Sequence, residues 1–156
     1  MFSQTTEYAL RAMSWLALSP DSLVSTHALA EKTQVPPHYL AKVLQQLSAA
    51  NLIVGRRGVR GGYKLARAAK QITLLDVVRS VAEIQRITAC PLGIGSHGSQ
   101  LCSLHRTTDA AAKAVIEIYG AVTLSDLLAD ARLPTPLCET ASPATLTISA
   151  PGPSRR

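Results

Sequence analysis

The sequence predicts a mainly α-helical protein with a small β-hairpin wing: a winged helix-turn-helix domain followed by a long dimerisation helix. Three observations predict this fold class. Apolar residues recur at helical spacing through the first fifty positions. Two prolines at positions 36 and 37 separate two short helical patterns. A loop that alternates glycine and arginine, at residues 55–62, then lies between two β-prone runs.

The bulk composition fits a small folded protein. Hydrophobic residues make up 47 % of the 156 residues and aromatic residues only 4 %, so we expect a core of Leu, Val, Ile and Ala. No apolar run reaches the roughly 18–20 residues that cross a bilayer. The sequence starts with polar residues and an amphipathic stretch rather than a secretory signal. We therefore expect a cytoplasmic protein with no membrane partner.

The positive charge is concentrated in one half of the chain. Residues 1–70 hold nine basic and three acidic residues, so they account for the whole net charge of +6. A polyanion-binding surface requires such an asymmetry, which favours nucleic acid as a partner. A solvated basic face is the alternative interpretation.

The first three helices follow from apolar spacing and from helix-breaking residues. Residues 7–18 form one helix, with an apolar stripe of Ala9, Ala12, Met13 and Leu16. Ser25 is a good N-cap for a short helix at 26–33, and Pro37 can begin a third helix at 37–50.

The third helix has the cleanest pattern of the three. Its apolar stripe consists of Leu40, Val43, Leu44 and Leu47. The opposite face presents His38, Lys42 and Gln45, with Tyr39 on the flank. A short helix, a tight turn and a second helix with a polar, basic outer face are what a helix-turn-helix needs. An ordinary helical hairpin shares this periodicity, so the pattern alone does not separate the two.

The next segment favours DNA binding. Residues 51–54 and 63–65 are β-prone and flank a loop with three arginines, Arg56, Arg57 and Arg60. The loop glycines allow positive φ and close backbone approach, and arginine pairs with phosphate oxygens at two points. The loop lacks the Gly-Lys-Ser/Thr end of a nucleotide-binding loop. We therefore predict a wing that contacts double-stranded DNA.

The second half of the chain is less regular. Thr73 and Asp76 resemble a capping box, and we expect the helix that they open to close the domain against the first helix. A helix at 103–119 is apolar on more than one side, so we expect the domain to cover one side and a second copy the other. A last short helix runs from 123 to about 131. The predicted organisation is a winged-helix DNA-binding domain at 1–83, a cysteine-containing sensor loop at 84–102, dimerisation helices at 103–131 and a disordered tail at 132–156.

Three motifs resemble one family. These are EYALRAM at 7–13, VPPHYL at 35–40 and RGVRGGY at 57–63. Together with the order of elements, they make the chain similar to the IscR/NsrR-type regulators of the Rrf2 family from about Thr5 to Ala131. The resemblance implies a homodimer that packs through the long helix and binds a palindromic promoter site.

The resemblance also implies which elements touch DNA. The third helix enters the major groove and the wing contacts the adjacent minor groove, which assigns roles to Tyr39, Arg57 and Arg60. Our interpretation of the helix adds His38, Lys42 and Gln45, and the second helix would bring Thr26 or His27 near phosphates. The predicted DNA-binding residues are Thr26, His38, Tyr39, Lys42, Gln45, Arg56, Arg57, Arg60, Gly61 and Gly62.

Many members of this family carry an iron–sulfur cluster that senses iron, redox state or nitric oxide. Their ligands resemble Cys-x5-Cys-x5-Cys, with a histidine three residues later or an acidic residue from the partner's first helix. The same spacing here gives Cys90, Ser96, Cys102 and His105, and Glu7 stands at the place of the acidic ligand. Serine is a poor iron ligand, because its hydroxyl hardly ionises at neutral pH.

Three interpretations of the sensor follow. A 2Fe–2S cluster is held by Cys90 and Cys102 with Glu7, His105 or, as a substitute, His97. Alternatively, the two cysteines form a metal-free thiol switch, or the loop has lost its sensor. Cys138 lies in the tail and is a weak candidate.

The predicted function is a transcriptional regulator, a repressor rather than an activator. The alternatives are a cluster-free regulator that uses the thiols or a small-molecule effector, and a winged-helix protein–protein module. We do not expect an enzyme, because the sequence shows no nucleophile–base set, phosphate loop or paired carboxylates.

Overall fold

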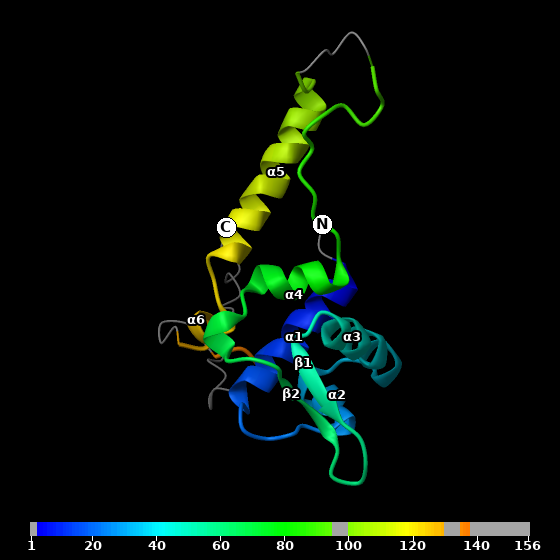
Figure 1. The fold of residues 1–156 in the computed structure, drawn as a ribbon, viewed down its shortest axis with the longest axis vertical. Coiled ribbons are helices and arrows are strands. Elements are labelled where there is room, and N and C mark those ends of the chain that lie inside the picture. Colours follow the sequence, from blue (N-terminus) through cyan, green and yellow to red (C-terminus); the bar gives the residue numbers. More distant parts are fainter. Residues whose placement is uncertain (1–2, 95–99, 130–134, 138–156) are drawn as a thin grey trace, which may run out of the picture.

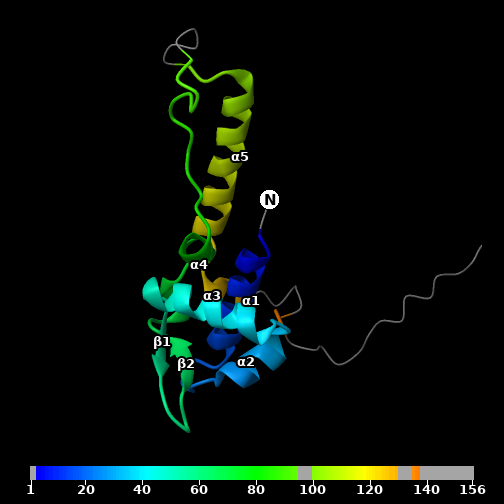
Figure 2. The ribbon, with the colours of Figure 1, turned by 90° about the vertical axis from the view of Figure 1, so that its right-hand side faces the viewer.

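The computed structural model describes residues 3–94, 100–129 and 135–137. Helices and a two-stranded hairpin form one domain, from which a long helix projects (Figures 1 and 2). The elements are α1 (Gln4–Leu18), α2 (Thr26–Thr33), α3 (Pro37–Ala49), β1 (Ile53–Arg56), β2 (Gly62–Leu65), η1 (Ala69–Gln71), α4 (Leu74–Val81), α5 (Ser103–Gly120) and α6 (Leu124–Ala129). This arrangement confirms the predicted fold class.

Helix α1 lies at the centre of the domain. It packs against α2, α3, α4 and α6. Its predicted stripe of Ala9, Ala12, Met13 and Leu16 has no exposed surface. The two alanines leave room for neighbouring helices to approach closely. The helix begins three residues earlier than predicted, because the Ser3 hydroxyl accepts a hydrogen bond from the Thr6 amide at 3.2 Å.

The pair α2–α3 has the predicted form. Ser25 caps α2 by accepting from the Ala28 amide at 3.2 Å, and Gln34 ends the helix in the left-handed region at φ 55°. Pro37 then occupies the first turn of α3, where its missing N–H costs nothing. The stripe of Leu40, Val43, Leu44 and Leu47 is buried against the domain.

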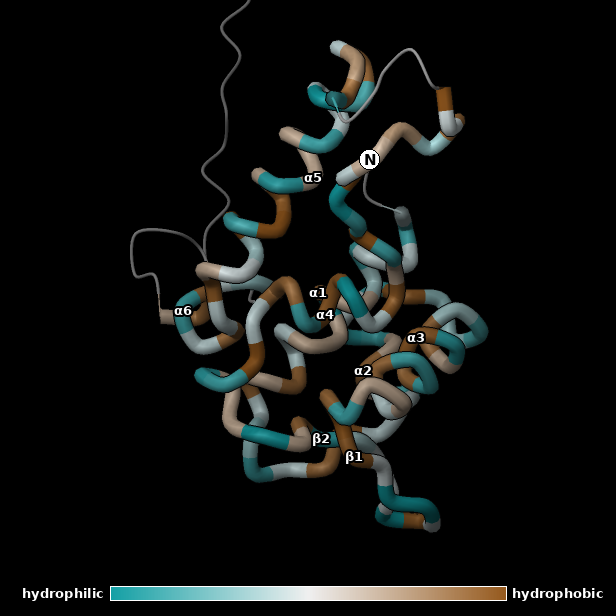
Figure 3. Tube along the Cα trace, turned by 45° about the horizontal axis from the view of Figure 1, so that its top comes forward, coloured by the Kyte–Doolittle hydropathy of each residue, from teal (hydrophilic) through white to brown (hydrophobic). Residues whose placement is uncertain are grey.

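The wing is an antiparallel hairpin whose register runs from the pair Ile53–Leu65 to the pair Arg56–Gly62. A backbone link that the sequence does not predict holds it to the helices. Val24 and Tyr63 exchange two N–H to carbonyl hydrogen bonds, of 2.9 and 2.8 Å. Figure 3 shows that the loop beyond the strands is largely hydrophilic, whereas apolar segments gather inside the domain.

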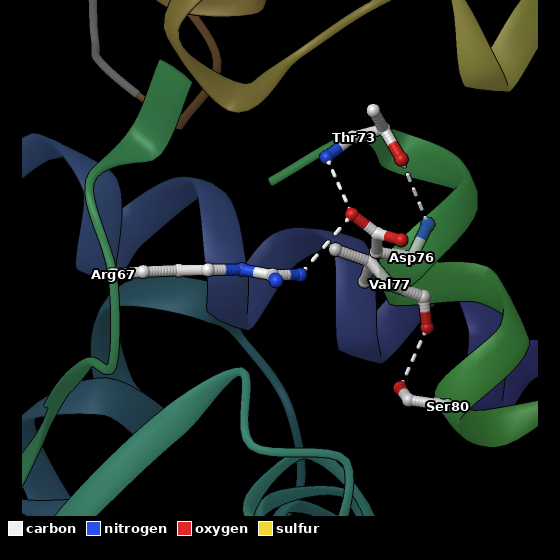
Figure 4. A network of polar contacts seen from close by, with 5 residues as sticks. All are labelled: Arg67, Thr73, Asp76, Val77 and Ser80. Carbon is white, nitrogen blue, oxygen red and sulfur yellow. Dashed lines mark hydrogen bonds and ion pairs between the residues drawn. The ribbon is translucent and has the colours of Figure 1, made fainter. Parts of the chain in front are cut away.

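The start of α4 is fixed by the predicted capping box. The Asp76 amide donates to the Thr73 hydroxyl at 3.1 Å, and the Thr73 amide donates to the Asp76 carboxylate at 3.0 Å. Arg67 adds an ion pair to the same carboxylate at 3.3 Å (Figure 4). Helix α4 packs against α1 and so closes the domain as predicted.

Helix α5 stands on the domain by its C-terminal end. No residue of α5 is buried, and the domain touches it through α4 (Figure 1). The domain therefore covers α5 at this end, which is less of the helix than the predicted coverage of one side. The chain after α5 is tied back by two hydrogen bonds of 2.9 Å, from the Leu74 amide to the Val122 carbonyl and from the Leu124 amide to the Ile72 carbonyl.

Helix α6 begins as predicted, where Thr123 and Asp126 repeat the capping arrangement. It is described to Ala129, so its expected end near residue 131 and nearly all of the predicted tail lie outside the described residues. No helix in the described part of the chain is both long and apolar enough to cross a membrane.

We expect Thr73→Ala to lower the free energy of unfolding by about 1 kcal/mol, because the Asp76 amide loses its capping acceptor. Thr73→Ser keeps a hydroxyl and is the control. Urea denaturation followed by circular dichroism measures both variants, and equal midpoints for the two would contradict a capping role.

Candidate nucleic-acid interface and cysteine segment

The outer face of α3 is polar, basic and exposed. His38, Lys42 and Gln45 are all solvent-exposed, one helical turn apart along one side. Tyr39 is 47 % exposed, although its ring lies against Tyr8 with a centroid separation of 6.0 Å. The rings of His38 and Tyr39 also meet, with centroids 4.2 Å apart. These contacts pre-order the start of α3 while leaving polar atoms available to a partner.

The wing presents three exposed arginines. Arg56, Arg57 and Arg60 form no ion pair with any other described residue. Their charge is therefore not neutralised within the described part of the molecule. Uncompensated guanidinium groups on a narrow hairpin attract a polyanion.

Two predicted glycines have a structural reason to be glycine. A Cβ on Gly62 would lie 2.5 Å from the Val24 carbonyl oxygen, and one on Gly61 would lie 2.3 Å from the Arg56 carbonyl oxygen. Gly62 is itself buried. The two glycines therefore let the hairpin close and dock on residue 24, and they shape the wing whether or not they also touch DNA.

A polar groove joins the wing to the two helices. Its volume is about 450 Å³, and it is lined by Thr26, Ser48, Gly55, Arg56, Arg57, Gly58, Gly61, Gly62 and Tyr63. The groove brings Thr26, at the start of α2, next to two of the wing arginines. The N-terminus of a helix carries partial positive charge and free N–H groups, so this arrangement suits a phosphate.

The groove separates two residues that the sequence left as alternatives. Thr26 lines it, whereas His27 lines a second, more apolar hollow of about 420 Å³ beside Pro36 and Pro37. Sequence reasoning missed Ser48, which lines the groove from the last turn of α3. Only its position one turn beyond Gln45 could have pointed to it.

The cysteine segment places two of its predicted donors together. Cys102 is the N-cap residue of α5, and its Sγ atom lies 3.4 Å from Nδ1 of His105 one turn later. Both side chains are partly exposed. A thiol and an imidazole at one helix end are suited to hold a metal or to exchange a proton.

Cys90 lies on an arm, residues 82–94, that runs from the end of α4 along α5 (Figures 1 and 2). The arm is fastened to α5 by Asp109. Its carboxylate accepts from Nε and Nη2 of Arg86 at 2.6 and 2.7 Å, and from the Ile87 amide at 2.9 Å. The Arg86 hydrogen bond is the main reason that the pKa of Asp109 falls from 3.8 to about 2.

Glu7 lies apart from these donors within one copy of the chain. Its carboxylate pairs with Nε of Arg11 at 2.9 Å on the exposed side of α1. Arg11 also reaches the Thr33 carbonyl, at the end of α2, at 3.5 Å. Among the described residues, no three His, Cys, Asp or Glu side chains form a group that could hold a metal ion. Ser96, His97 and Cys138 lie outside the described residues.

Comparison with known proteins shows which family the chain resembles. Residues 2–130 match the family model Rrf2, described as "Iron-dependent Transcriptional regulator". The chain is 30 % identical over 131 residues to the HTH-type transcriptional regulator NsrR of Geobacillus kaustophilus, covering 80 % of this chain and 87 % of that one. It is 28 % identical over 131 residues to an HTH-type regulator of Aquifex aeolicus, covering 82 % and 91 %.

Solved structures have the same fold. The IscR structure from T. potens aligns with a TM-score of 0.69 at 26 % identity, over 84 % of this chain and 88 % of that one. CymR of B. subtilis, titled the global cysteine regulator, aligns with a TM-score of 0.68 at 25 % identity, over 81 % and 95 %. These proteins are regulators, in agreement with the expectation that the chain is not an enzyme.

Proposed function

The chain belongs to the Rrf2 family of transcriptional regulators, and from this premise we propose that it acts as a homodimer on a palindromic promoter site. The observation that carries the proposal is the polar groove where Thr26 of α2, Ser48 of α3 and the arginines Arg56 and Arg57 converge. Three separate elements meet there with unneutralised positive charge. A concave, polar surface lined by arginines suits the phosphate backbone of DNA.

The contacts divide by chemistry. Arg56, Arg57 and Arg60 of the wing bind phosphates or the minor groove, and the start of α2 binds a phosphate through Thr26. The exposed side of α3 offers Lys42 and Gln45 to base edges in the major groove, where their donors distinguish base pairs. Phosphate contacts set the position of the protein on the duplex, and α3 supplies the sequence preference.

A second copy of the chain would cover the apolar side of α5. Leu104 is 68 % exposed and Ile118 is 63 % exposed, and the exposed alanines Ala111 and Ala114 lie between them. A helix with so much exposed apolar surface needs a partner in water. Two copies related by a two-fold axis would present two α3 helices to two half-sites, so the preferred site is a palindrome.

We propose repression as the output, because a dimer bound over a promoter site excludes other proteins from the same DNA. The signal would act on α5 and the arm, which lie at the opposite end of the molecule from the wing (Figures 1 and 2). A signal changes DNA binding only if it favours one dimer geometry over another. The spacing between the two α3 helices is the geometry that such a shift would alter.

The donor chemistry of the cysteine segment fits a 2Fe–2S cluster. Sγ of Cys102 lies 3.4 Å from Nδ1 of His105. Cys90 would supply the second thiol by approaching this pair, because the described donors do not form a three-residue group within one copy of the chain. Mixed thiolate and imidazole ligation is known for such clusters. We propose Cys90, Cys102 and His105 as ligands, with Glu7 of a second copy as the fourth. The cluster, when bound, supplies a centre that responds to oxidants and to iron supply.

The wing arginines provide the first test of DNA binding. Changing Arg57 and Arg60, singly and together, to Ala should weaken binding to every duplex and lower the slope of log affinity against log salt by about one per lost phosphate contact. Fluorescence anisotropy over a salt series measures both quantities. Arg79→Ala, at an exposed position of α4 away from the wing, removes one positive charge and is the control for each single variant. Unchanged affinity in the double variant would show that the wing is not part of the interface. DNA binding by the parent protein that is weak and insensitive to salt would favour a protein–protein module.

The dimer has its own test. Ile118→Glu should convert the protein to a monomer, because a carboxylate would lie within the paired apolar faces of α5. Analytical ultracentrifugation gives the mass, and DNA titration should show that affinity for a palindrome falls toward that for a half-site. Lys113→Gln changes an exposed polar position on the same helix and should stay dimeric. A dimeric Ile118→Glu protein would show that α5 is not the interface.

The cluster is tested by the absorption spectrum of protein purified without oxygen, with iron and sulfide assayed on the same sample. We expect a broad visible band that is lost in Cys102→Ala and changed in His105→Ala, because both remove ligands. Cys138→Ala removes a thiol outside the proposed set and should keep the band. A colourless, iron-free protein that still binds DNA would favour a thiol switch between Cys90 and Cys102 or a small-molecule effector.

A further inference from the structure

We propose that Asp109 is a positioning residue that sets the register of the arm on α5 and thereby holds Cys90 level with the Cys102–His105 pair. This inference rests on the sensing role given above to the cysteine segment. It concerns the protein without metal, so it applies equally to a cluster site and to a thiol switch. Its basis is the three-contact attachment that Asp109 makes to Arg86 and Ile87.

The Asp109 attachment differs from the other ion pairs of the described residues. Asp109 has only 15 % of its side chain exposed, whereas the carboxylates of the other three pairs are 41 to 64 % exposed. Both of its oxygens take part in a two-point contact with the Arg86 guanidinium. Such paired geometry fixes direction as well as distance. The third contact, from the Ile87 amide at 2.9 Å, fixes the backbone of the arm itself.

The arm depends on such a polar attachment because apolar packing holds it weakly. No residue of α5 is buried, and Arg86 of the arm is exposed. Without the contacts to Asp109, a segment of irregular backbone could slide along the helix. A hydrogen bond from the backbone of Ile87 prevents this sliding at one defined level of α5.

The spacing along the chain then places the donors at one height. Cys102 precedes Asp109 by seven residues, a rise of about 10 Å along α5. Cys90 follows Arg86 by four residues, which span up to about 13 Å of chain. The arm runs toward the N-terminal end of α5 in both views (Figures 1 and 2). Starting from a common level at Asp109, the arm is therefore long enough for Cys90 to reach the end of the helix at which Cys102 stands.

The Asp109 attachment is permanent at physiological pH. Arg86 and the Ile87 amide hold the pKa of Asp109 at about 2, below its ordinary 3.8, although partial burial opposes this effect. Its contribution to stability is therefore present above pH 4 and is lost as the pH falls toward 2. The attachment consequently acts as a fixed brace rather than as a pH switch.

A thiol cross-linking rate tests this role without metal or DNA. The reduced, metal-free protein carries Cys138→Ser, which leaves Cys90 and Cys102, and is treated with dibromobimane, which fluoresces once both of its ends have alkylated thiols. We expect Asp109→Asn to slow the Cys90–Cys102 cross-link by roughly tenfold, because misplaced groups lose effective concentration. Arg86→Gln should do the same, and exchanging the pair as Arg86→Asp with Asp109→Arg should restore part of the rate.

Controls separate position from reactivity and from folding. Glu117→Gln removes an exposed carboxylate from the same helix and should cross-link at the parent rate. Monobromobimane should label each single thiol equally fast in the parent and in Asp109→Asn. Circular dichroism melting should show a folded protein in every variant. Equal cross-linking in the parent and in a folded Asp109→Asn variant would overturn the proposal, as would a parent protein that does not cross-link.

Salt-dependent DNA binding of the same metal-free samples separates a failure of the proposed DNA-binding function from a failure of the positioning role of Asp109. A slow cross-link in Asp109→Asn together with normal parent affinity for DNA supports both proposals. If the parent binds DNA neither metal-free nor as purified without oxygen, but Asp109→Asn still cross-links slowly, the proposed function fails and the positioning role stands. Normal DNA binding with an unchanged cross-linking rate leaves the proposed function standing and rejects the positioning role.

Discussion

The burial of α1 is the constraint on which the domain depends. Four helices contact it, and its small residues, Ala9 and Ala12, let them approach while Met13 and Leu16 fill the space between them. Complete burial of a side chain such as Leu16 contributes about 1.5–3 kcal/mol. Because α2, α3, α4 and α6 all pack against α1, their mutual orientation is set by a single helix. The direction in which α3 presents His38 and Lys42 follows from that packing.

The groove follows from a second constraint, which acts on the backbone. The exchange of hydrogen bonds between Val24 and Tyr63 ties the wing to the segment just before α2. This link is close because Gly62 has no Cβ, which would otherwise lie 2.5 Å from a carbonyl oxygen. The wing arginines are therefore held beside the start of α2 by main-chain geometry. Phosphate-binding groups on separate elements gain affinity from such pre-ordering, since less freedom is lost on binding.

Helix α5 and the arm are held by fewer buried contacts than the domain. Helix α5 has no core of its own, and it is attached to the domain at its base and to the arm through Asp109. Few buried contacts mean that such a region changes orientation at low cost. The molecule thus combines a tightly packed winged-helix domain with a loosely supported helix and arm, whose cysteines are Cys102 at the start of the helix and Cys90 on the arm. This division suits the proposed regulator, because a signal acting on the helix and the arm can change their orientation while the winged-helix domain keeps its shape.

The sequence alone determined the parts that depend on local chemistry. Ser25, Pro37 and the pair Thr73–Asp76 set the ends of three helices, and apolar spacing identified the buried faces of α1 and α3. These signals lie within a few residues of one another, so they can be recognised without a partner. The same holds for the exposed basic residues of the wing and of α3, because residue type and glycine pattern mark them directly.

Tertiary structure decided which of these residues act together. The bridge from Val24 to Tyr63, the entry of Ser48 into the groove and the separation of Thr26 from His27 all join positions that no periodicity connects. The attachment of Arg86 to Asp109 spans 23 residues and links a coil to a helix, so neither local pattern reveals it. The sequence also does not reveal how little of α5 the domain covers. A helix with apolar residues on several sides has the same pattern whether its partner is this domain or a second copy. Helix ends and buried faces depend on neighbouring residues, so the sequence alone reveals them. Long-range contacts depend on how the packed helices direct the chain between them, so only the tertiary structure reveals them.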